Sequence, residues 1–518
     1  MAIYSAAFLG LVLLFIIIHE IVGAFAAKYQ WLVRLAASVS FYLIVSGVRI
    51  FFVFISALSI WQGALFIERL ANECKIKRKG EGLSKEEKKK IKADYQKRKK
   101  LLMFSIIFIN LGILAVVKYF LPVAGIGIAL PIGISFYTFQ AIAYMVDIYG
   151  EKYDAQHSFL RILLYLMWFP QLIQGPINRY DAIKEDLYKQ TRLSMSVLRY
   201  AVYLFLFGAI KRYLIGDLLD PMVNNILSGD ISVFPGSYLL FGAFLYAIEQ
   251  YANFSGGIDM VMAVSMLFGV KMAENFKQPY FSKSLAQFWR RWHISLGAFM
   301  RDYVFYPFAM TKTMQNFTKK AGNKWGNHFA RSVTGGLGNL IVFALVGIWH
   351  GPQLHFLAWG LYNGVIIAIS DACSPLFDRM KKALKIKDDS RLFTLFQMLR
   401  TFMIIVFAGY FDVVDSVRNG VRCFIKTFFD FGISEFSNCL ATDMENNLLD
   451  MRMIIAVIVG IVLLLIFSIL RENKKDPIAL ICERHFALRW VIFYIMFFAF
   501  LISFSMAGGA GGFMYAAF

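Results

Sequence analysis

Charged residues are scarce in this chain. Only 17% of its 518 residues are Asp, Glu, Lys or Arg, whereas a soluble domain carries about a quarter. The five cysteines include no C-x-x-C pair and show no spacing typical of metal ligands. These shortages argue against an ordinary soluble domain and against a cysteine-ligated metal site.

Several motifs of nucleotide-dependent and hydrolytic enzymes are also missing. The chain has no G-x-S-x-G nucleophile turn, no H-E-x-x-H pair and no G-x-x-x-x-G-K-S/T phosphate loop. The glycine-rich stretches Gly335–Gly338 and Gly508–Gly512 do not fit a dinucleotide fingerprint, and we interpret both as close helix packing or turns. The sequence therefore gives no support to an ATP-driven or flavin-dependent mechanism.

Long apolar runs take the place of the missing charge. The chain is 58% hydrophobic and 17% aromatic, and uninterrupted runs include Leu9–Ile18, Leu101–Val117, Met453–Ile469 and Trp490–Phe504. With their flanking small residues, such runs match a hydrocarbon layer of roughly 30 Å. We therefore predict an all-α, multi-pass membrane protein, with about 11–13 transmembrane and re-entrant helices in one membrane domain over residues 1–518. The expected spans include residues 159–175, 235–254 and 257–270.

The net charge of +20 is unevenly distributed. Fourteen of the 54 basic residues fall in the loop Arg69–Lys100, and Lys/Arg-rich loops beside membrane spans mark the cytoplasmic side and meet anionic lipids. Within this loop, Ser84–Glu87 is a capping-box pattern that predicts a helix running into the next span. Asp430–Asp450 has five acidic residues and no basic one, which indicates an external segment. The charge thus reflects topology and lipid contact, and no nucleic-acid partner is expected.

Polar residues interrupt the apolar sequence most densely at Phe288–Tyr303. An ionisable group at a bilayer centre costs at least about 2.5–3.5 kcal/mol, so its retention indicates an aqueous cavity or a function. On a continuous helix, Trp289 and His293 would share one face, and Arg301 and Asp302 can neutralise each other. The alternative is an amphipathic helix at the membrane interface.

A second interruption, Ile348–Pro352, contains His350. Because Gly351-Pro352 forces a turn, His350 is expected near the end of a span or inside a broken helix, where the freed backbone must line protein or water. The alternative is a histidine that caps a helix at the interface. Weaker interruptions at Gln171–Arg179 and Glu249–Asp259 either line a cavity or join helices through hydrogen bonds.

The ordered motifs resemble a known family. Leu130–Gln140, Phe169–Pro176, Asn275–Tyr280, Phe288–Tyr303 and Trp349–Gly351 occur in the order seen in membrane-bound O-acyltransferases (MBOAT), in the bacterial branch that includes subunits for alginate and cellulose O-acetylation. Residues from about 100 to 370 carry the resemblance. Ala252-Asn253 departs from it, since the family often has an aspartate there.

The resemblance implies a ring of helices around a central tunnel in a bacterial cell membrane, with His350 as the catalytic histidine and His293 as a second motif histidine. We expect His350 to deprotonate the acceptor hydroxyl or activate a carrier nucleophile, and His293 to bind or polarise the acyl carbonyl. Trp349 would wall the tunnel. Arg290 and Arg291 would contact the phosphates of coenzyme A. The other residues expected along the tunnel are Trp289, Trp292, Ser295, Arg301, Asp302, Tyr303, Gln174, Asn253, Ser255 and Asp259.

The resemblance also implies substrates and partners. We expect acetyl-CoA as donor, with no permanently bound cofactor and no metal, and an extracytoplasmic polysaccharide as acceptor. An external SGNH-type acyltransferase subunit is the expected protein partner. A D-alanyl carrier-protein thioester, used to modify teichoic acid, is the alternative donor. A transporter or flippase is the alternative from another class, but no internal repeat supports it.

Overall fold

The computed structural model describes residues 6–123, 125, 129–446 and 450–506. These residues are predominantly helical and contain no β-strand; one isolated β-bridge joins Phe276 and Trp292. The predicted all-α class is confirmed. The described helices divide into two compact units, residues 6–202 with 261–273 (unit 1) and residues 203–260 with 274–506 (unit 2), which are described separately.

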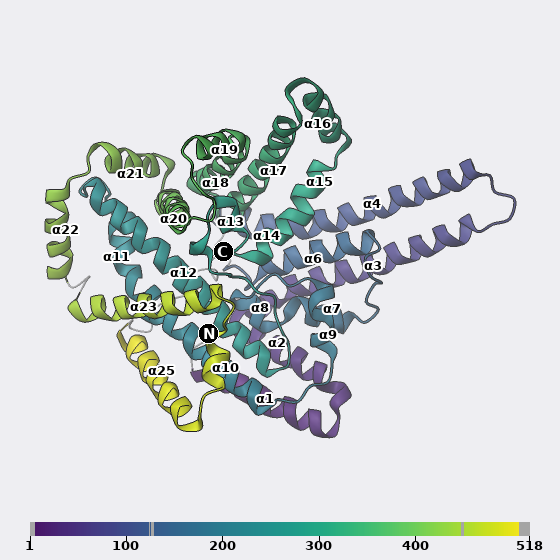
Figure 1. Cartoon of the computed structure of the whole chain (residues 1–518). Coiled ribbons are helices and arrows are strands. Elements are labelled where there is room, and N and C mark those ends of the chain that lie inside the picture. The colour runs from purple at the N-terminus through teal and green to yellow at the C-terminus, as the bar shows by residue number, and fades with distance from the viewer. Residues whose placement is uncertain (1–5, 124, 126–128, 447–449, 507–518) are drawn as a thin grey trace. The chain divides into compact units, whose positions relative to one another are not determined.

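Unit 1 begins with long helices and continues with shorter ones (Figure 1). Its helices are α1 (Ala6–Phe25), α2 (Gln30–Ser46), α3 (Ile50–Arg78), α4 (Lys85–Ala115), α5 (Leu121–Val123), α6 (Ile134–Tyr149), α7 (Phe159–Met167), α8 (Phe169–Gln174) and α9 (Tyr180–Tyr188), with the π-helical turn η3 (Val116–Phe120) after α4 and short 3₁₀ turns η1 (Ala27–Tyr29) and η2 (Gly47–Arg49) on either side of α2. The helix α10 (Met195–Ile210) leads from this unit into unit 2.

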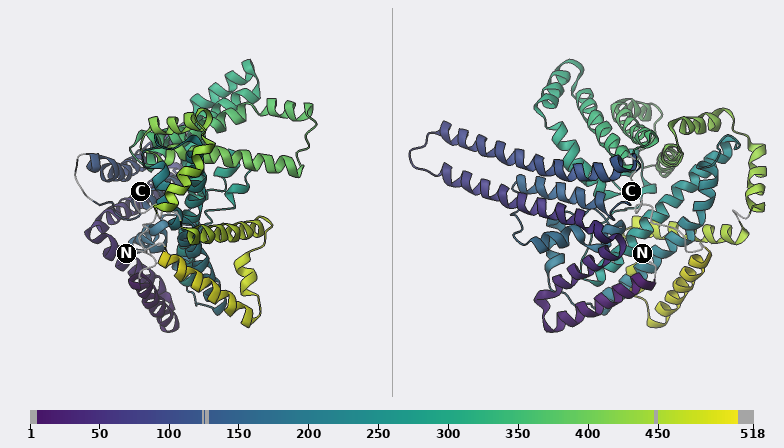
Figure 2. Two further views of the ribbon diagram at one scale, coloured as in Figure 1. Left: turned by 90° about the vertical axis from the view of Figure 1, so that its left-hand side faces the viewer. Right: turned by 180° about the vertical axis from the view of Figure 1, so that it is seen from behind.

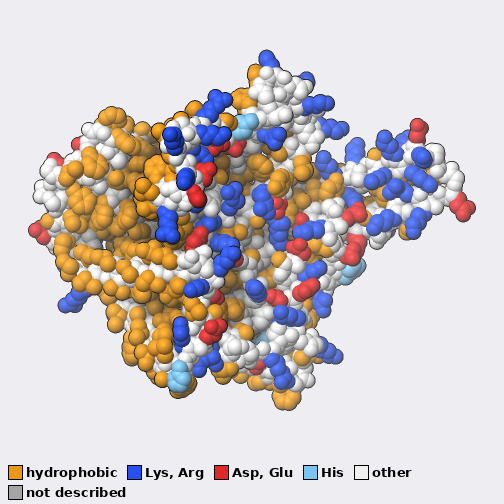
Figure 3. Space-filling model, viewed as in Figure 1, with side chains coloured by type: hydrophobic (Ala, Val, Ile, Leu, Met, Phe, Trp, Pro, Cys, Tyr) orange, Lys and Arg blue, Asp and Glu red, His pale blue; other side chains and the backbone are white. Residues whose placement is uncertain are grey.

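The helices α3 and α4 form a projecting hairpin that carries the basic loop (Figures 1 and 2). Ser84 caps α4 with both bonds of a capping box, as predicted: its hydroxyl accepts from the Glu87 N–H, and the Glu87 carboxylate accepts from the Ser84 N–H. At 29 and 31 residues, and about 1.5 Å per residue, both helices are longer than a hydrocarbon layer is thick. Lys and Arg side chains cover the projecting end (Figure 3).

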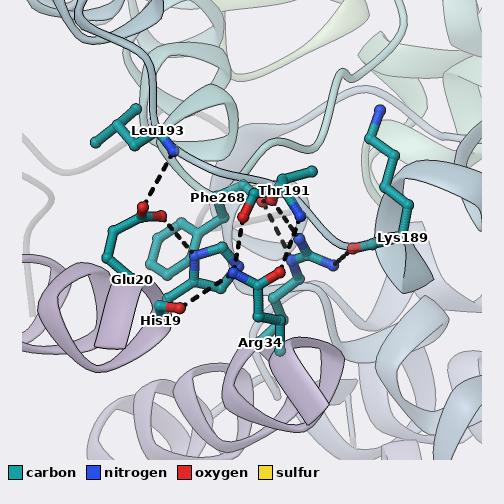
Figure 4. A network of polar contacts seen from close by, with 8 residues as sticks. His19, Glu20, Arg34, Lys189, Thr191, Leu193 and Phe268 are labelled. Carbon is teal, nitrogen blue, oxygen red and sulfur yellow. Dashed lines mark hydrogen bonds and ion pairs between the residues drawn. The ribbon is translucent and has the colours of Figure 1, made fainter. Parts of the chain in front are cut away.

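A buried arginine ties the first helices of unit 1 to later segments (Figure 4). Arg34 on α2 donates to the carbonyl oxygens of Leu187, Lys189 and Phe268 at 2.9–3.1 Å, and to the Thr191 hydroxyl at 2.8 Å. These carbonyls lie at or beyond the ends of helices, where backbone acceptors lack intrahelical partners. The guanidinium with its five donors is therefore matched to helix ends that would otherwise be unsatisfied.

Unit 2 contains the segments from which the candidate site is built (Figure 1). Its elements include the π-helical turn η4 (Lys211–Gly216), α11 (Asp217–Leu227), α12 (Gly236–Leu267, which ends in unit 1), η5 (Pro279–Phe281), α13 (Leu285–Trp289), α14 (Ile294–Met300), the π-helical turn η6 (Arg301–Phe305), α15 (Tyr306–Ala309), α16 (Lys312–Trp325), α17 (Asn327–His350), α18 (Leu354–Ala372), α19 (Ser374–Ala383), α20 (Arg391–Val413), α21 (Val417–Phe429), α22 (Ile433–Glu445), α23 (Met451–Glu472), α24 (Pro477–Cys482) and α25 (Phe486–Met506).

The helices α17 and α18 approach each other closely through glycine. A Cβ at Gly347 would lie 2.4 Å from the Phe356 carbonyl oxygen, and a Cβ at Gly360 would lie 2.2 Å from the Phe343 carbonyl oxygen. A side chain at either position would force the helices apart. Gly338 likewise packs against the Phe305 ring and Gly336 against Ala368, which confirms close helix packing at these two glycines, whereas Gly335 faces open space. The corresponding prediction for Gly508–Gly512 lies outside the described residues.

Among the described residues, seven helices are long and apolar enough to cross a membrane, or up to eight if the pair α18 and α19, bent by 56°, is one span. Leu, Ile and Phe side chains on the outward faces of α1, α23 and α25 are exposed, which suits lipid rather than water as solvent. The chain is therefore a multi-pass membrane protein. The structure divides some expected spans into shorter helices such as α7 and α8, so the count of 11–13 transmembrane and re-entrant helices stays a prediction.

Candidate active site

A short backbone pairing positions the first histidine. The Lys277 N–H donates to the Arg291 carbonyl, and the Ile294 N–H donates to the Asn275 carbonyl, on either side of the Phe276–Trp292 bridge. His293 follows this bridge with a positive φ of 46° and precedes α14 as its N-cap residue. Trp289 and His293 therefore do not share the face of one continuous helix, because α13 ends at Trp289 and the chain turns before α14.

One amide oxygen determines which nitrogen of His293 is protonated. The Ser295 backbone N–H donates to Asn275 Oδ1 at 3.1 Å, and because a backbone N–H can only donate, this atom is the amide oxygen. The same oxygen accepts from the Ser295 hydroxyl at 2.9 Å and lies 3.2 Å from His293 Nδ1. Neutral His293 therefore carries its proton on Nδ1 and presents a lone pair at Nε2. A lone pair cannot donate to a carbonyl, which argues against the expected polarising role of neutral His293.

The second histidine lies at the end of a helix. His350 is the last residue of α17, and Gly351 and Pro352 separate it from α18. Its ring centre lies 4.9 Å from that of Trp359 on α18 and 5.1 Å from that of Trp349. The break expected at this position is present, and the close packing of α17 on α18 brings the Trp359 indole over the imidazole.

The structure brings the two histidines to the same indole. The Trp349 ring centre lies 6.4 Å from that of His293, and His350 adjoins Trp349 in the chain. His293 and His350 are only 3% and 7% exposed, so neither imidazole meets bulk water freely. Two imidazoles separated by 57 positions in the sequence thus share one buried aromatic setting within unit 2.

A cavity of about 460 Å³ opens beside His293. Its walls include Trp289, Trp292, Phe343 and Val346, which are apolar or aromatic, while Arg290 and Arg301 contribute charge. A mostly apolar cavity with a few convergent polar groups is the usual form of a small-molecule site. The cavity therefore provides space for a substrate directly next to one of the two imidazoles.

Two tryptophans from the Phe288–Tyr303 segment support this cavity. The Trp289 indole N–H donates to Asn363 Oδ1 on α18 at 3.1 Å, and its ring contacts Trp359 edge-on at 5.5 Å. Trp292 is buried against Phe276 and Phe288. Both tryptophans line the cavity, and Trp289 holds the His293 segment against α17 and α18.

The arginines of this segment differ in their surroundings. Arg291 forms a bidentate ion pair with Glu472 on α23, at 2.9 and 3.1 Å, which gives it a structural role. Arg290 is exposed and lines the cavity. Arg301 pairs with its neighbour Asp302 at 2.8 Å, as the sequence suggested. Tyr303 is half-buried and its ring contacts Phe299.

Four of the expected tunnel residues, all from α12 or α8, have other neighbours than the cavity beside His293. On α12, Phe254 contacts the His293 ring at 5.0 Å. Asp259 pairs with Lys211 of η4 at 2.7 Å, and Ser255 accepts from the same ammonium at 2.9 Å. Asn253 packs close to Gly216 of η4. Gln174 is buried in α8 of unit 1. None of these four side chains lines the cavity beside His293.

Two residues of this region were not singled out from the sequence. Asn275 had no assigned role, because its importance depends on the backbone pairing with residues 291–294. Lys211 gave a signal that was overlooked: a lysine within an otherwise apolar run requires a partner. His355, at the start of α18, has its Nδ1 3.0 Å from the Phe411 carbonyl oxygen, as a structural histidine would.

Comparison with known proteins now places this arrangement in a class. The family model for MBOAT, the membrane-bound O-acyltransferase family, matches residues 149–413, slightly more than half of the chain. The matched region includes both histidines, the cavity and the α17–α18 pair. The chain belongs to the membrane-bound O-acyltransferase family.

Individual relatives carry different names within this class. The chain is similar to a probable alginate O-acetylase AlgI of Pseudomonas aeruginosa, at 28% identity over 68% of this chain and 60% of that protein. It is 29% identical to a teichoic acid D-alanyltransferase of Bacillus subtilis over 54% of this chain and 67% of that protein. A peptidoglycan O-acetyltransferase of Helicobacter pylori is 27% identical over 47% of this chain and 48% of that protein. The similarity thus spans about 60% or less of the length of the alginate relatives.

Proposed function

We propose that this protein transfers an acyl group, namely acetyl, from a cytoplasmic thioester across the membrane to a hydroxyl of an extracytoplasmic polysaccharide. The observation that carries the proposal is the meeting of His293 and His350 at the Trp349 indole, beside a cavity in a chain of this family. Buried imidazoles beside a substrate-sized space are suited to moving a proton during acyl transfer.

The proposed reaction is a direct transfer in which His350 acts as general base. The acceptor hydroxyl oxygen attacks the thioester carbonyl carbon while His350 takes the hydroxyl proton. The C–S bond then breaks, and the proton passes from the imidazolium to the departing thiolate, so that an ester and a free thiol result. A positioned general base contributes typically about 10²–10⁴-fold to such a rate.

The proposed role of His293 follows from its tautomer. With its proton on Nδ1 held toward Asn275, His293 presents Nε2 as an acceptor. It can therefore accept a hydrogen bond from the acceptor hydroxyl and orient the oxygen for attack. Orientation of this kind converts a bimolecular encounter into a pre-arranged one. The apolar walls formed by Trp289, Trp292 and Trp349 would limit hydrolysis of the thioester by water.

The proposed reaction also requires a donor and an acceptor, and we propose a protein partner for it. Acetyl-CoA is the proposed donor, which would bind transiently. Relatives named for alginate and peptidoglycan acetylation support a polysaccharide acceptor. An external SGNH-type acyltransferase subunit is proposed as partner, and the acidic segment Asp430–Asp450 is a suitable surface for it.

One alternative has a specific observation in its favour. The teichoic acid D-alanyltransferase of Bacillus subtilis matches this chain over a larger share of its own length than the alginate relatives do. D-alanyl transfer from a carrier-protein thioester would use the same two histidines. Supplying the purified protein with either labelled thioester separates the two donors, and the genes adjacent to its own provide an independent indication.

The central experiment replaces the proposed base. His350→Ala should lower transfer of labelled acetyl from acetyl-CoA to alginate oligosaccharides by at least about 100-fold, while expression and membrane insertion are unchanged. The matched control is His485→Ala, because His485 is an exposed histidine in the connection before α25. Near-normal turnover by His350→Ala would remove His350 from the mechanism. Absence of transfer by the unmodified protein with either donor would refute the proposed function.

A further inference from the structure

A second open space in unit 2 lies between α15, α16 and α17. The connection at Gly326 turns α16 back along the first half of α17, and the Thr318 and Thr334 hydroxyl oxygens meet at 2.6 Å across the two helices. Beside this contact is a groove of about 520 Å³, here called the α16–α17 groove. Its polar lining residues are Gln315, Thr318, Lys319, Asn327, Arg331 and Thr334.

The α16–α17 groove carries positive charge, and no acidic residue close to it in the sequence neutralises that charge. The sequence contains no Asp or Glu between Asp302 and Asp371, although five Lys and Arg residues occur there. Lys319 and Arg331 are exposed and take part in no ion pair recorded among the described residues. Blue side chains gather over α16 in the space-filling view (Figure 3). Two free cations with neighbouring amide and hydroxyl groups are suited to phosphate oxygens.

One face of α17 leads from this groove to the candidate active site. Spacings of three and four residues place one set on a single helix face: Arg331, Gly335, Asn339, Val342, Val346 and His350. Arg331 and Gly335 line the groove. Asn339, Val342 and Val346 line the cavity beside His293, and His350 is the proposed base. At 1.5 Å per residue, this face covers about 28 Å from Arg331 to His350.

The groove and the cavity also share a wall. Phe305, at the end of the π-helical turn η6, lines both spaces. Its ring can lie against α17 only because position 338 is glycine, since a Cβ there would come within 2.7 Å of the ring. The polar groove and the mostly apolar cavity therefore adjoin at one aromatic side chain, all within unit 2.

We infer that the α16–α17 groove binds the phosphate-bearing end of the thioester donor, whose flexible arm runs along this face of α17 into the cavity. The inference rests on the proposed function. It names Lys319 and Arg331 as the phosphate ligands, in place of Arg291, which is already paired with Glu472. The groove is suited to either a coenzyme A donor or a carrier protein's phosphopantetheine group, since both carry phosphate next to a pantetheine arm.

The first experiment compares a donor with phosphates and a donor without. In the double variant Lys319→Glu/Arg331→Glu, the KM for acetyl-CoA should rise about tenfold or more, because charge-assisted contacts are lost. The kcat, and the KM for S-acetyl-pantetheine, which has no phosphate, should stay unchanged. The matched control is Lys312→Glu/Lys324→Glu, which makes the same change of charge on α16 at exposed positions that do not line the groove.

A second variant blocks the groove sterically. No heavy atom lies within 4 Å of the position that a Cβ at Gly335 would occupy, and Gly335 lines the groove, so we expect the side chain added in Gly335→Leu to occupy groove space. Leucine also favours a helix more than glycine does. We expect this variant to keep its thermal stability and to lose affinity for acetyl-CoA, whereas Gly335→Ala should bind almost normally.

The outcomes separate the inference from the proposed function. If the unmodified protein transfers acetyl and the groove variants leave the KM for acetyl-CoA unchanged, the groove assignment is wrong while the function stands. If transfer is absent, direct titration of the purified protein with coenzyme A still tests the groove, because the charge-reversed variant should bind about tenfold more weakly. An effect that appears equally with S-acetyl-pantetheine, and only in vesicles rich in phosphatidylglycerol, would identify a lipid headgroup site and overturn the donor assignment.

Discussion

At the residue scale, the protonation of His293 depends on Asn275. An aspartate at position 275 would still accept from His293 Nδ1 and Ser295, but its negative charge would raise the pKa of His293, which lies outside the seven long apolar helices. If catalysis needs neutral His293, less of the active form remains at a given pH. In Asn275→Asp, we therefore expect the acid limb of the kcat/KM–pH profile to move to higher pH by about one unit.

The control for this prediction is Ser295→Ala. It removes the hydroxyl that donates to the same amide oxygen at 2.9 Å and leaves the contact with the imidazole in place. Its acid limb should therefore not move. An unchanged profile for Asn275→Asp would show that Asn275 holds the chain in place without acting through His293.

The same residues show what the sequence does and does not reveal at this scale. His293 and His350 stand out in the sequence because ionisable side chains in apolar surroundings are costly. The partner that fixes the tautomer does not stand out. Asn275 reaches His293 through an isolated pairing of short segments, and no helical or strand periodicity marks such a pairing in advance.

At the scale of elements, glycine explains one difference between expectation and structure. Segments 235–254 and 257–270 were expected as separate spans, yet α12 runs unbroken from Gly236 to Leu267. Gly256 does not end the helix. A Cβ at position 256 would lie 2.6 Å from the Gly208 carbonyl oxygen, so glycine at this position allows α12 to pack closely against α10. By contrast, the start of α4 was predictable, because a capping box depends only on residues 84–87.

The contact between η4 and α12 supports a stability prediction. Lys211 and Asp259 form an ion pair at 2.7 Å with little exposure of either side chain. Lys211→Met should destabilise the protein by about 3–5 kcal/mol, because it leaves a buried carboxylate without its partner. Replacing both residues, as Lys211→Met/Asp259→Leu, should recover most of that loss. Thermal unfolding in detergent micelles measures each variant.

The control for this cycle is Lys324→Met, an exposed lysine outside the pair, which should change stability little. Additive losses in the double variant would show that the two side chains are not energetically coupled. In that case the pairing between η4 and α12 would depend on close glycine packing alone.

At the scale of the whole molecule, the distribution of charged residues predicts the topology of the chain in the membrane. The α3–α4 hairpin carries most of the basic loop 69–100, and residues 85–100 of α4 are mostly charged. The acidic residues of Asp430–Asp450 occur mainly around α22. Because basic loops stay in the cytoplasm, the hairpin and α22 should lie on opposite sides.

This topology can be tested by labelling with a thiol reagent that does not cross membranes. In a background with the five native cysteines replaced by alanine, a cysteine introduced at Lys89 should react only in inside-out vesicles, and one at Asn438 only in intact cells. Both positions lie outside the apolar runs and are exposed, Lys89 on α4 and Asn438 on the short helix α22. The control is the cysteine-free protein, which should not react from either side. Labelling of both positions from the same side would mean that the chain crosses the membrane an even number of times between residues 89 and 438. The acidic segment would then not lie on the acceptor side. The proposed external partner would have no surface there to bind.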